Sequence, residues 1–223
     1  MINEQLVKTE FHFHTAETSP CGVATASESI CLFAQKGYGG AIVTDHYLPD
    51  MFESMETRSL FLKGYYAAKK AAETLDFTVL PGMEFRFFDA DNDFLVYGME
   101  EADFAKLPTG LSRYSLKDFH AYCGDHGWLL FQAHPFRPWC KAQNPAYLDG
   151  VEIYNGNIRQ LSHNEQAVAF ARDNNLLAVA GGDVHQLVDV RDESLRVPRH
   201  LLTPKGIVAF LQSRPQINAA YWA

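Results

Sequence analysis

Seven short apolar runs recur along the 223-residue chain, and helix-like stretches separate most of them. Most of these runs are continuously apolar, which is typical of strands that helices cover on both faces of a parallel sheet. Strand–helix units repeated in this way imply parallel pairing through right-handed crossovers. The predicted strands cover residues 7–14, 39–44, 78–88, 94–99, 127–133, 150–154 and 176–182.

Helix signals fall between the predicted strands. Capping boxes are predicted at Thr25–Glu28 and Ser162–Glu165. Another helix is expected to begin at Ser115, and residues 56–75 carry a helical apolar pattern. Thr203-Pro204 combines an N-cap with proline at the first helical position.

The number of strand–helix units and the chain length restrict the fold. Seven units in 223 residues favour an α/β fold, either a compact, distorted barrel or an open doubly wound sheet. The length fits one domain better than two. Because no linker, low-complexity tract or repeat divides the sequence, we expect a single domain over residues 1–223.

Charge and composition exclude some classes of function. A formal charge of -8 argues against binding long nucleic acid, which requires a basic face. A small anionic substrate stays possible because bound cations can supply local positive charge. We expect no membrane association: the first residues do not form a signal peptide, and no apolar run approaches the ~20 residues of a membrane span. Four cysteines without CxxC spacing predict reduced thiols in a cytoplasmic protein.

Histidines and carboxylates gather where the predicted strands end. In a parallel α/β barrel these ends converge on one face, so the side chains would meet. Burying such groups without partners costs on the order of several kcal/mol each, and divalent cations would compensate them. The residues are His12, His14, Asp45, His46, Glu84, His134, Glu152, Asn155, Asp183 and His185.

Each of these motifs is weak evidence when taken alone. His12 and His14 have the period-two spacing for chelation from one side of a strand, whereas Asp45-His46 alone is typical of a polar strand exit. Gly181-Gly182 beside Asp183-Val184-His185 is more specific, because glycines permit close backbone approach to the chelating pair. The recurrence of such groups in one structural context predicts a metal site.

This ordered series resembles the PHP family (polymerase and histidinol phosphatase), and the match runs from residue 10 to residue 185 in the family's order. The resemblance implies a distorted (β/α)7 TIM-like barrel, two or three divalent ions (zinc, manganese or iron) and phosphoester hydrolysis. The motifs that carry it are His12-Phe13-His14-Thr15, Thr44-Asp45-His46, Pro81-Gly82-Met83-Glu84, His134-Pro135, Glu152 with Asn155-Gly156, and Gly182-Asp183-Val184-His185.

The resemblance also implies a set of metal ligands. It assigns His12, His14 and Asp183 to one ion, His134 to a second, Glu84 as the bridge between them, and His46 and His185 to a third or bridging position.

Three positions depart from the family pattern. Glu10 stands where the family usually has aspartate. Residues 18–21 lack the family's further histidine or acidic ligand, so Cys21 and Glu17 are candidates to replace it. Asp93 stands where another ligand histidine often occurs, and a carboxylate still binds a hard cation. Two or three ions therefore remain possible.

The expected reaction is hydrolysis of a small phosphomonoester, in the manner of a histidinol phosphatase, by a metal-activated water. Asp183 or His185 would relay a proton. Three arginines follow strand-end motifs and are candidates for bidentate phosphate contacts, although each could equally be an ordinary surface residue. They are Arg86, Arg137 and Arg159.

Other functions compete with this hypothesis. A metal amidohydrolase would often use a carboxylated lysine, and no lysine occupies a predicted strand end. A non-catalytic metal-binding module is disfavoured by the nearly complete ligand set, and exonuclease action by the negative charge. The sequence leaves open the substrate, the metal and the oligomeric state.

Overall fold

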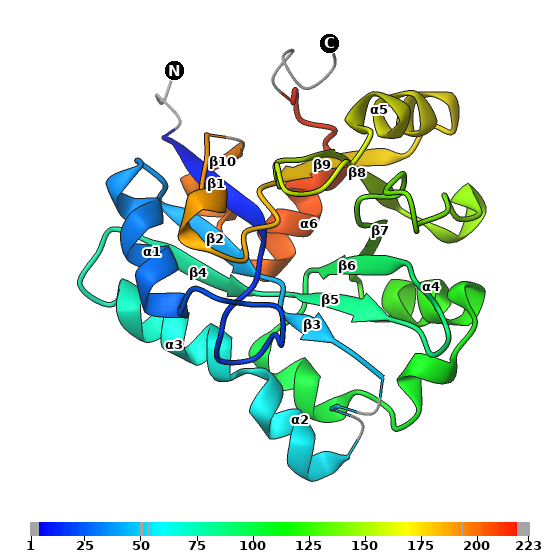
Figure 1. The fold of residues 1–223 in the computed structure, drawn as a ribbon, viewed down its shortest axis with the longest axis horizontal. Helices are drawn as coiled ribbons and strands as arrows, with labels where there is room; N and C mark the ends of the chain where they lie inside the picture. Colours follow the sequence, from blue (N-terminus) through cyan, green and yellow to red (C-terminus); the bar gives the residue numbers. More distant parts are fainter. Residues whose placement is uncertain (1–4, 50, 53, 193, 218–223) are drawn as a thin grey trace.

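Strands pair into two sheets in the computed structural model, which describes residues 5–49, 51–52, 54–192 and 194–217 (Figure 1). One sheet has the order β10-β1-β2-β4, and the other has the order β3-β5-β6-β7-β8-β9. The strands are β1 (Leu6–Phe13), β2 (Gly40–Val43), β3 (His46–Tyr47), β4 (Thr78–Pro81), β5 (Met83–Arg86), β6 (Asp93–Tyr97), β7 (Leu129–Gln132), β8 (Gly150–Asn155), β9 (Leu177–Gly181) and β10 (Leu195–Pro198).

Helices lie against these sheets, as the mixed α/β pattern of the sequence predicts. Figure 1 shows α1 and α3 side by side along the four-stranded sheet, while α5 packs on β8 and α4 on β7. The α-helices are α1 (Ala26–Gln35), α2 (Met55–Phe61), α3 (Lys63–Ala72), α4 (Leu116–Asp125), α5 (Asn164–Asp173) and α6 (Pro204–Gln212). The 3-10 helices are η1 (Glu101–Lys106), η2 (Leu111–Arg113), η3 (Pro145–Tyr147), η4 (Leu187–Asp189) and η5 (Arg199–Leu201). Within the described ranges, no helix is both long and apolar enough to cross a membrane.

The chain passes from one sheet to the other at four points, between β2 and β3, β3 and β4, β4 and β5, and β9 and β10. The end of β1 also meets the segment that follows β9, the edge strand of the six-stranded sheet: His14 N donates to Val184 O at 2.8 Å, and Val184 N donates to His12 O at 3.2 Å. Across the described residues, however, the strand ladders form two sheets and not one closed barrel. This arrangement still brings the ends of β1, β3, β5 and β9 together.

Pairing around β6 and β10 is antiparallel, so the expectation of uniformly parallel strands is wrong there. Residues 87–92 join β5 to β6, and so short a connection forms a hairpin, because a parallel crossover needs about a dozen residues or more. The hairpin register places Arg86 opposite Asp93 and Glu84 opposite Leu95.

Most predicted helix starts are confirmed. Thr25 accepts a hydrogen bond from Glu28 N in a complete capping box, and Ser115 and Thr203 cap α4 and α6 through their side chains. The second capping box is wrong: α5 begins after His163, whose backbone is left-handed (φ 48°) and whose side chain makes no cap. The Ser162 hydroxyl instead lies 3.4 Å from Arg137 Nε.

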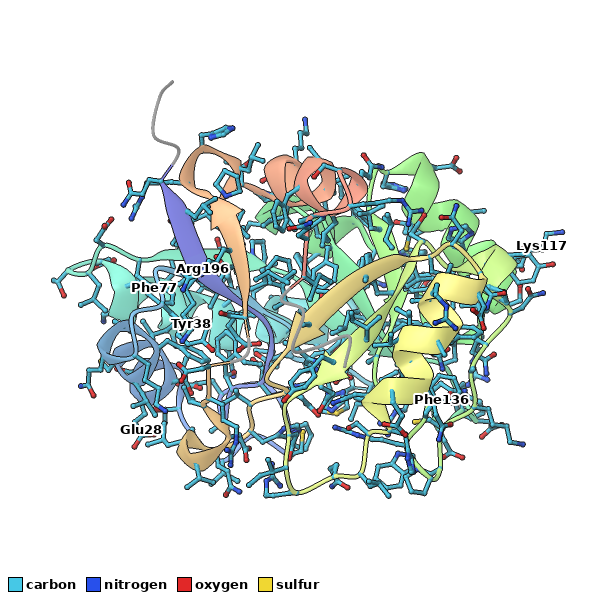
Figure 2. All side chains as sticks on the ribbon, turned by 90° about the horizontal axis from the view of Figure 1, so that it is seen from above. Glu28, Tyr38, Phe77, Lys117, Phe136 and Arg196 are labelled. Atoms are coloured by element: carbon cyan, nitrogen blue, oxygen red, sulfur yellow. The ribbon has the colours of Figure 1, made fainter. Side chains whose placement is uncertain are left out.

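Aromatic side chains fill the space beneath the strand ends. Phe11, Phe13 and Phe85 are fully buried. On the loop after β7, Phe136 packs edge-to-face on Phe170 of α5, with ring centroids 5.8 Å apart (Figure 2). This packing fixes the strand ends from which the polar residues project.

Candidate metal centre

Two imidazoles at the end of β1 point at the same place. His12 and His14 are both fully buried, and their Nε2 atoms lie 3.2 Å apart. Side chains two residues apart on a strand project from the same face, and the two imidazoles keep this relation although the pairing of β1 with β2 shifts register between Glu10 and Phe13. It is the geometry of a chelate, as the sequence predicts.

Glu84 lies at the centre of the imidazoles. Its Oε1 is 3.3 Å from His12 Nε2 and 3.2 Å from His134 Nε2. Its Oε2 is 3.2 Å from His14 Nε2 and 3.0 Å from His46 Nδ1. One carboxylate in β5 therefore faces four histidines from three other parts of the chain.

Asp183 faces the same cluster from the other side. Its Oδ1 lies 3.4 Å from His12 Nε2, 3.3 Å from His14 Nε2 and 3.4 Å from His185 Nδ1. Its Oδ2 accepts a hydrogen bond of 2.5 Å from Arg137, which is buried. The left-handed backbone of Asp183 (φ 48°), just after β9, turns the carboxylate toward the cluster.

Buried acceptors behind the cluster determine which imidazole nitrogen faces inward. His12 Nδ1 is 2.8 Å from Glu152 Oε1, so this nitrogen donates and Nε2 keeps its lone pair for the centre. His14 Nδ1 faces the Ser19 hydroxyl at 3.3 Å, and Ser19 already donates to Asp45 at 2.6 Å. His14 therefore also donates outward and presents Nε2 to the centre.

The electrostatics of these residues fit a bound cation. Burial raises the pKa of Glu84, but His46 and His12 outweigh it and hold the pKa well below its usual value. Burial and the neighbouring His46 lower the pKa of His14, but Asp183 and Glu84 outweigh them and raise it to about 9. The carboxylates thus demand positive charge between them and the imidazoles, which divalent ions supply by displacing the protons.

Ligand atoms also have the spacing that ions need. Four groups of side chains each place their ligand atoms within 4.8 Å of one another. All eight ligands predicted from the sequence belong to these groups, and the residues therefore fit divalent ions. The groups are His12, His134 and Asp183; His12, His14 and Glu84; His46, Glu84 and Asp93; and His14, Cys21, His46 and His185.

Comparison with known proteins identifies the fold of the chain. No protein-family model and no curated protein matches the sequence. Among solved structures, a two-domain protein from Bacteroides vulgatus that contains a predicted PHP-like metal-dependent phosphoesterase matches with a TM-score of 0.59 and 18% identity. The match covers 84% of this chain but only 55% of that one. The chain has a PHP-family fold.

Two further solved structures with other named activities also match this chain. An amidohydrolase from Chromobacterium violaceum, with bound sulfate and no metal, matches with a TM-score of 0.60 and 16% identity over 96% of this chain and 99% of that one. The lesion-specific endonuclease PfuEndoQ from Pyrococcus furiosus matches with a TM-score of 0.51 and 11% identity over 82% of this chain and 49% of that one. At these identities the likeness shows the fold alone.

Each of the three predicted phosphate-binding arginines holds a carboxylate in this PHP-family fold. Arg86 donates twice to Asp93, at 2.6 Å each, and Arg159 donates twice to Asp189, at 3.0 and 2.8 Å. Arg137 binds Asp183. Their contact with a substrate stays a prediction.

The structure separates Cys21 from Glu17, the two residues that the sequence offers as candidates for a further ligand position. Cys21 belongs to one of the four groups, and hydrogen bonds with His185 and His46 outweigh the effect of burial and lower the pKa of its thiol to about 5. Glu17, the other candidate for this position, instead accepts a hydrogen bond from Ala26 N at the start of α1. The fold of the loop after β1 places Cys21, and not Glu17, beside the cluster.

Glu10 has a supporting position behind the centre. Its Oε1 accepts hydrogen bonds from the backbone nitrogens of Phe11, His12 and Gly182, so it ties β1 to the loop that carries Asp183. Burial raises the pKa of Glu10 to about 7, although these backbone hydrogen bonds oppose the shift. The acidic residue before the histidine pair thus joins two strand ends.

Proposed function

We propose that this chain is a metal-dependent phosphoesterase that hydrolyses a small phosphomonoester at a bi- or trinuclear centre. The observation that carries the proposal is the position of Glu84, whose two oxygens lie 3.0–3.3 Å from four histidines. A carboxylate so placed is suited to bridge two ions. The proposed ligands are His12, His14, His46, Glu84, Asp93, His134, Asp183 and His185.

Bound divalent ions, for which zinc, manganese and iron are the candidates, would activate a water molecule and neutralise charge on the phosphoryl group. The chain's own residues orient these ligands. Glu152 binds His12 Nδ1 and, through Oε2, accepts from His134 N at 2.9 Å, so one carboxylate aligns ligands from two strands. Partners of this kind hold ligand geometry and raise ligand basicity.

Proton transfer is assigned to Asp183 or His185. The side chain of His185 is 14% exposed, whereas that of Asp183 is 1% exposed. His185 Nδ1 lies 2.9 Å from the Asp183 carbonyl oxygen, which directs its other nitrogen away from that strand end. A partly open imidazole beside the centre is suited to return a proton to the leaving group in the state in which its second nitrogen is not bound to an ion.

The arginines are proposed to bind the substrate phosphate. A guanidinium has five N–H donors, and two of them serve the carboxylate in Arg86 and in Arg159. The remaining donors are available because these side chains are 34% and 40% exposed. Arg137 is buried between Asp183 and Asn155, so positioning of Asp183 is its better-supported role.

Amide hydrolysis is the second candidate, because a C. violaceum amidohydrolase shares the fold. Against it, no lysine in the described ranges is buried, so none is placed to act as a carboxylated bridging ligand. Nucleic acid is a less favoured substrate at a charge of -8, although PfuEndoQ, an endonuclease, shares the fold.

Finer features of the chain are also proposals. Counting β2 with β3 and β4 with β5, and leaving out the antiparallel edge strand β10, gives seven strand positions, which supports a distorted (β/α)7 barrel over a single domain, residues 1–223. The four cysteines are free thiols, in keeping with a cytoplasmic protein.

The proposal is tested with purified protein, metal analysis and three substrates: an aryl phosphate, an aryl phosphodiester and an anilide. We expect at least two ions per chain and fastest turnover of the phosphomonoester. Turnover of only the anilide would replace phosphoesterase with amidohydrolase, and bound ions without turnover of any substrate would indicate a metal-binding module. His12→Ala should abolish turnover, while His126→Ala, a matched change at an exposed C-cap, should not.

A further inference from the structure

We propose that the thiolate of Cys21 is a metal ligand, and that with His14, His46 and His185 it forms a sulfur-containing site that selects zinc-like ions. This inference rests on the proposed metal centre and names the chemistry of one position in it. The ligand atoms of these four residues lie within 4.8 Å of one another. None of them comes from a carboxylate, in contrast to the group of His46, Glu84 and Asp93.

The three imidazoles lie close together. The rings of His14 and His46 have centroids 4.5 Å apart at an interplanar angle of 28°, and those of His14 and His185 are 4.3 Å apart at 34°. His14 thus lies between the other two rings. Cys21 completes the group from the loop that follows β1.

That loop is held in place by the histidine that the proposal pairs with Cys21. Val23 N and Ala24 N both donate to the carbonyl oxygen of His185, at 2.8 and 3.0 Å. Gly22 permits the tight approach this needs, because a Cβ there would lie 2.4 Å from Thr15 O. The position of Cys21 beside His185 is therefore built by the backbone and does not depend on a chance side-chain rotamer.

A second observation points to a ligand at this place. His46 is 9% exposed, and among the described residues its Nδ1 has no hydrogen-bond partner although it lies 3.0 Å from Glu84 Oε2. A buried nitrogen that faces a carboxylate without a hydrogen bond requires a cation or a proton nearby. An ion held jointly with neighbouring donors satisfies it.

Ligand chemistry then predicts which ion this position takes. Thiolate and imidazole favour zinc and comparable borderline ions, whereas carboxylate oxygen suits manganese and magnesium. Cys21, His46 and His185 offer sulfur and nitrogen, while Glu84 and Asp93 offer oxygen. The cluster is thus divided into a zinc-preferring position beside Cys21 and positions that also accept harder ions.

Cobalt(II) absorption spectroscopy tests the assignment without relying on turnover, because a thiolate bound to cobalt gives an intense charge-transfer band that imidazole and carboxylate do not give. Metal-free wild-type protein titrated with cobalt should develop this band, and Cys21→Ser should lack it. Cys21→His should restore the number of bound ions without the band. Loss of the thiolate should also weaken zinc binding at one position by more than about tenfold, the lower end of the loss caused by removing an outer-shell partner.

Two matched variants exclude two of the three other thiols, and the third, Cys123, is buried in α4 outside the four ligand groups. Cys31→Ser removes an exposed thiol on α1, and Cys140→Ser removes the thiol that lies 3.9 Å from His134 Nδ1. Both should keep the band. Cobalt binding without the band in the wild type, or a band that survives Cys21→Ser, would overturn the thiolate ligand while leaving the metal centre intact. Failure of the wild type to bind cobalt at all would refute the metal centre as well.

Discussion

The inner and outer halves of the centre differ in how firmly the protein holds them. The inner half consists of His12, His14, Glu84 and Asp183, whose side chains are at most 1% exposed. The outer half consists of Cys21, His46 and His185, and the latter two side chains are 11% and 14% exposed. Buried hydrogen-bond partners hold the side chains of the inner half in place. The outer half consists of a loop residue and two partly exposed imidazoles. We infer that the inner half retains ions and the outer half admits substrate and protons.

The largest effect should come from the inner half. Asp183→Asn keeps the side-chain shape but removes the charge that faces His12 and His14. We expect kcat/KM for an aryl phosphate to fall on the order of a thousandfold, because a metal centre supplies several kcal/mol of transition-state stabilisation. Steady-state kinetics in saturating Mn²⁺ measure it. Asp192→Asn, the same change at an exposed carboxylate, serves as the control, and equal activity of the two variants would remove Asp183 from the centre.

A smaller effect is expected from the residue behind His12. Glu152 accepts hydrogen bonds from His12 Nδ1, His134 N and Asn155 Nδ2, and a glutamine has one acceptor oxygen in place of two. Glu152→Gln should weaken metal binding by about 10–100-fold. Competition with a chelator of known affinity measures the change. Wild-type affinity in this variant would show that the inner half does not need its buried partner.

A third comparison concerns the arginines at the rim. Arg86 holds Asp93, which belongs to the cluster, whereas Arg159 holds Asp189, which lies outside the four ligand groups. Arg86→Lys should therefore raise KM for a phosphomonoester by about tenfold, the equivalent of one charged hydrogen bond. Arg159→Lys should raise it less. Substrate titrations of both variants measure the two KM values. A larger rise in KM for Arg159→Lys than for Arg86→Lys would place the phosphate subsite near Arg159 and not at β5.

Sequence reasoning found the inner half because its evidence is local. The spacing of His12 and His14 already defines a chelate on a strand, and Asp183 follows a recognisable run of small and apolar residues. Likewise, most strands were predicted because continuous apolar runs mark them. The evidence for these residues and strands therefore lies within a few neighbouring positions of the sequence.

Long-range geometry explains what sequence reasoning missed. Residues 78–88 read as one strand, but Gly82 divides them between two sheets, where a Cβ would lie 2.9 Å from the Ile42 side chain. The Arg86–Asp93 pair depends on the register of an antiparallel hairpin that the apolar pattern does not specify. Cys21 could not be chosen over Glu17 because the choice depends on how the loop after β1 folds back on His185.

The smallest predicted effect is the response of the metal-free protein to pH. The pKa of His14 is raised from 6.5 to about 9, so the stability gained from its proton is complete below about pH 6.5 and is lost as the pH rises through 9. The pKa of Glu10 is raised from 4.5 to about 7. The stability gained from its proton is therefore complete below about pH 4.5 and is lost as the pH rises through 7.

In chelator, the unfolding midpoint should therefore fall by several degrees between pH 5 and pH 9, since each kcal/mol moves it by about 2–4 °C in a chain of this size. His14→Gln should reduce the fall above pH 7, to which His12 and His46 also contribute through their raised pKa values, and should leave the part due to Glu10. Saturating zinc should flatten the His14 part, because ions then occupy the position of the proton. A midpoint that rises with pH in chelator would mean that the inner half does not hold its imidazoles charged, and its firm retention of ions would need another cause.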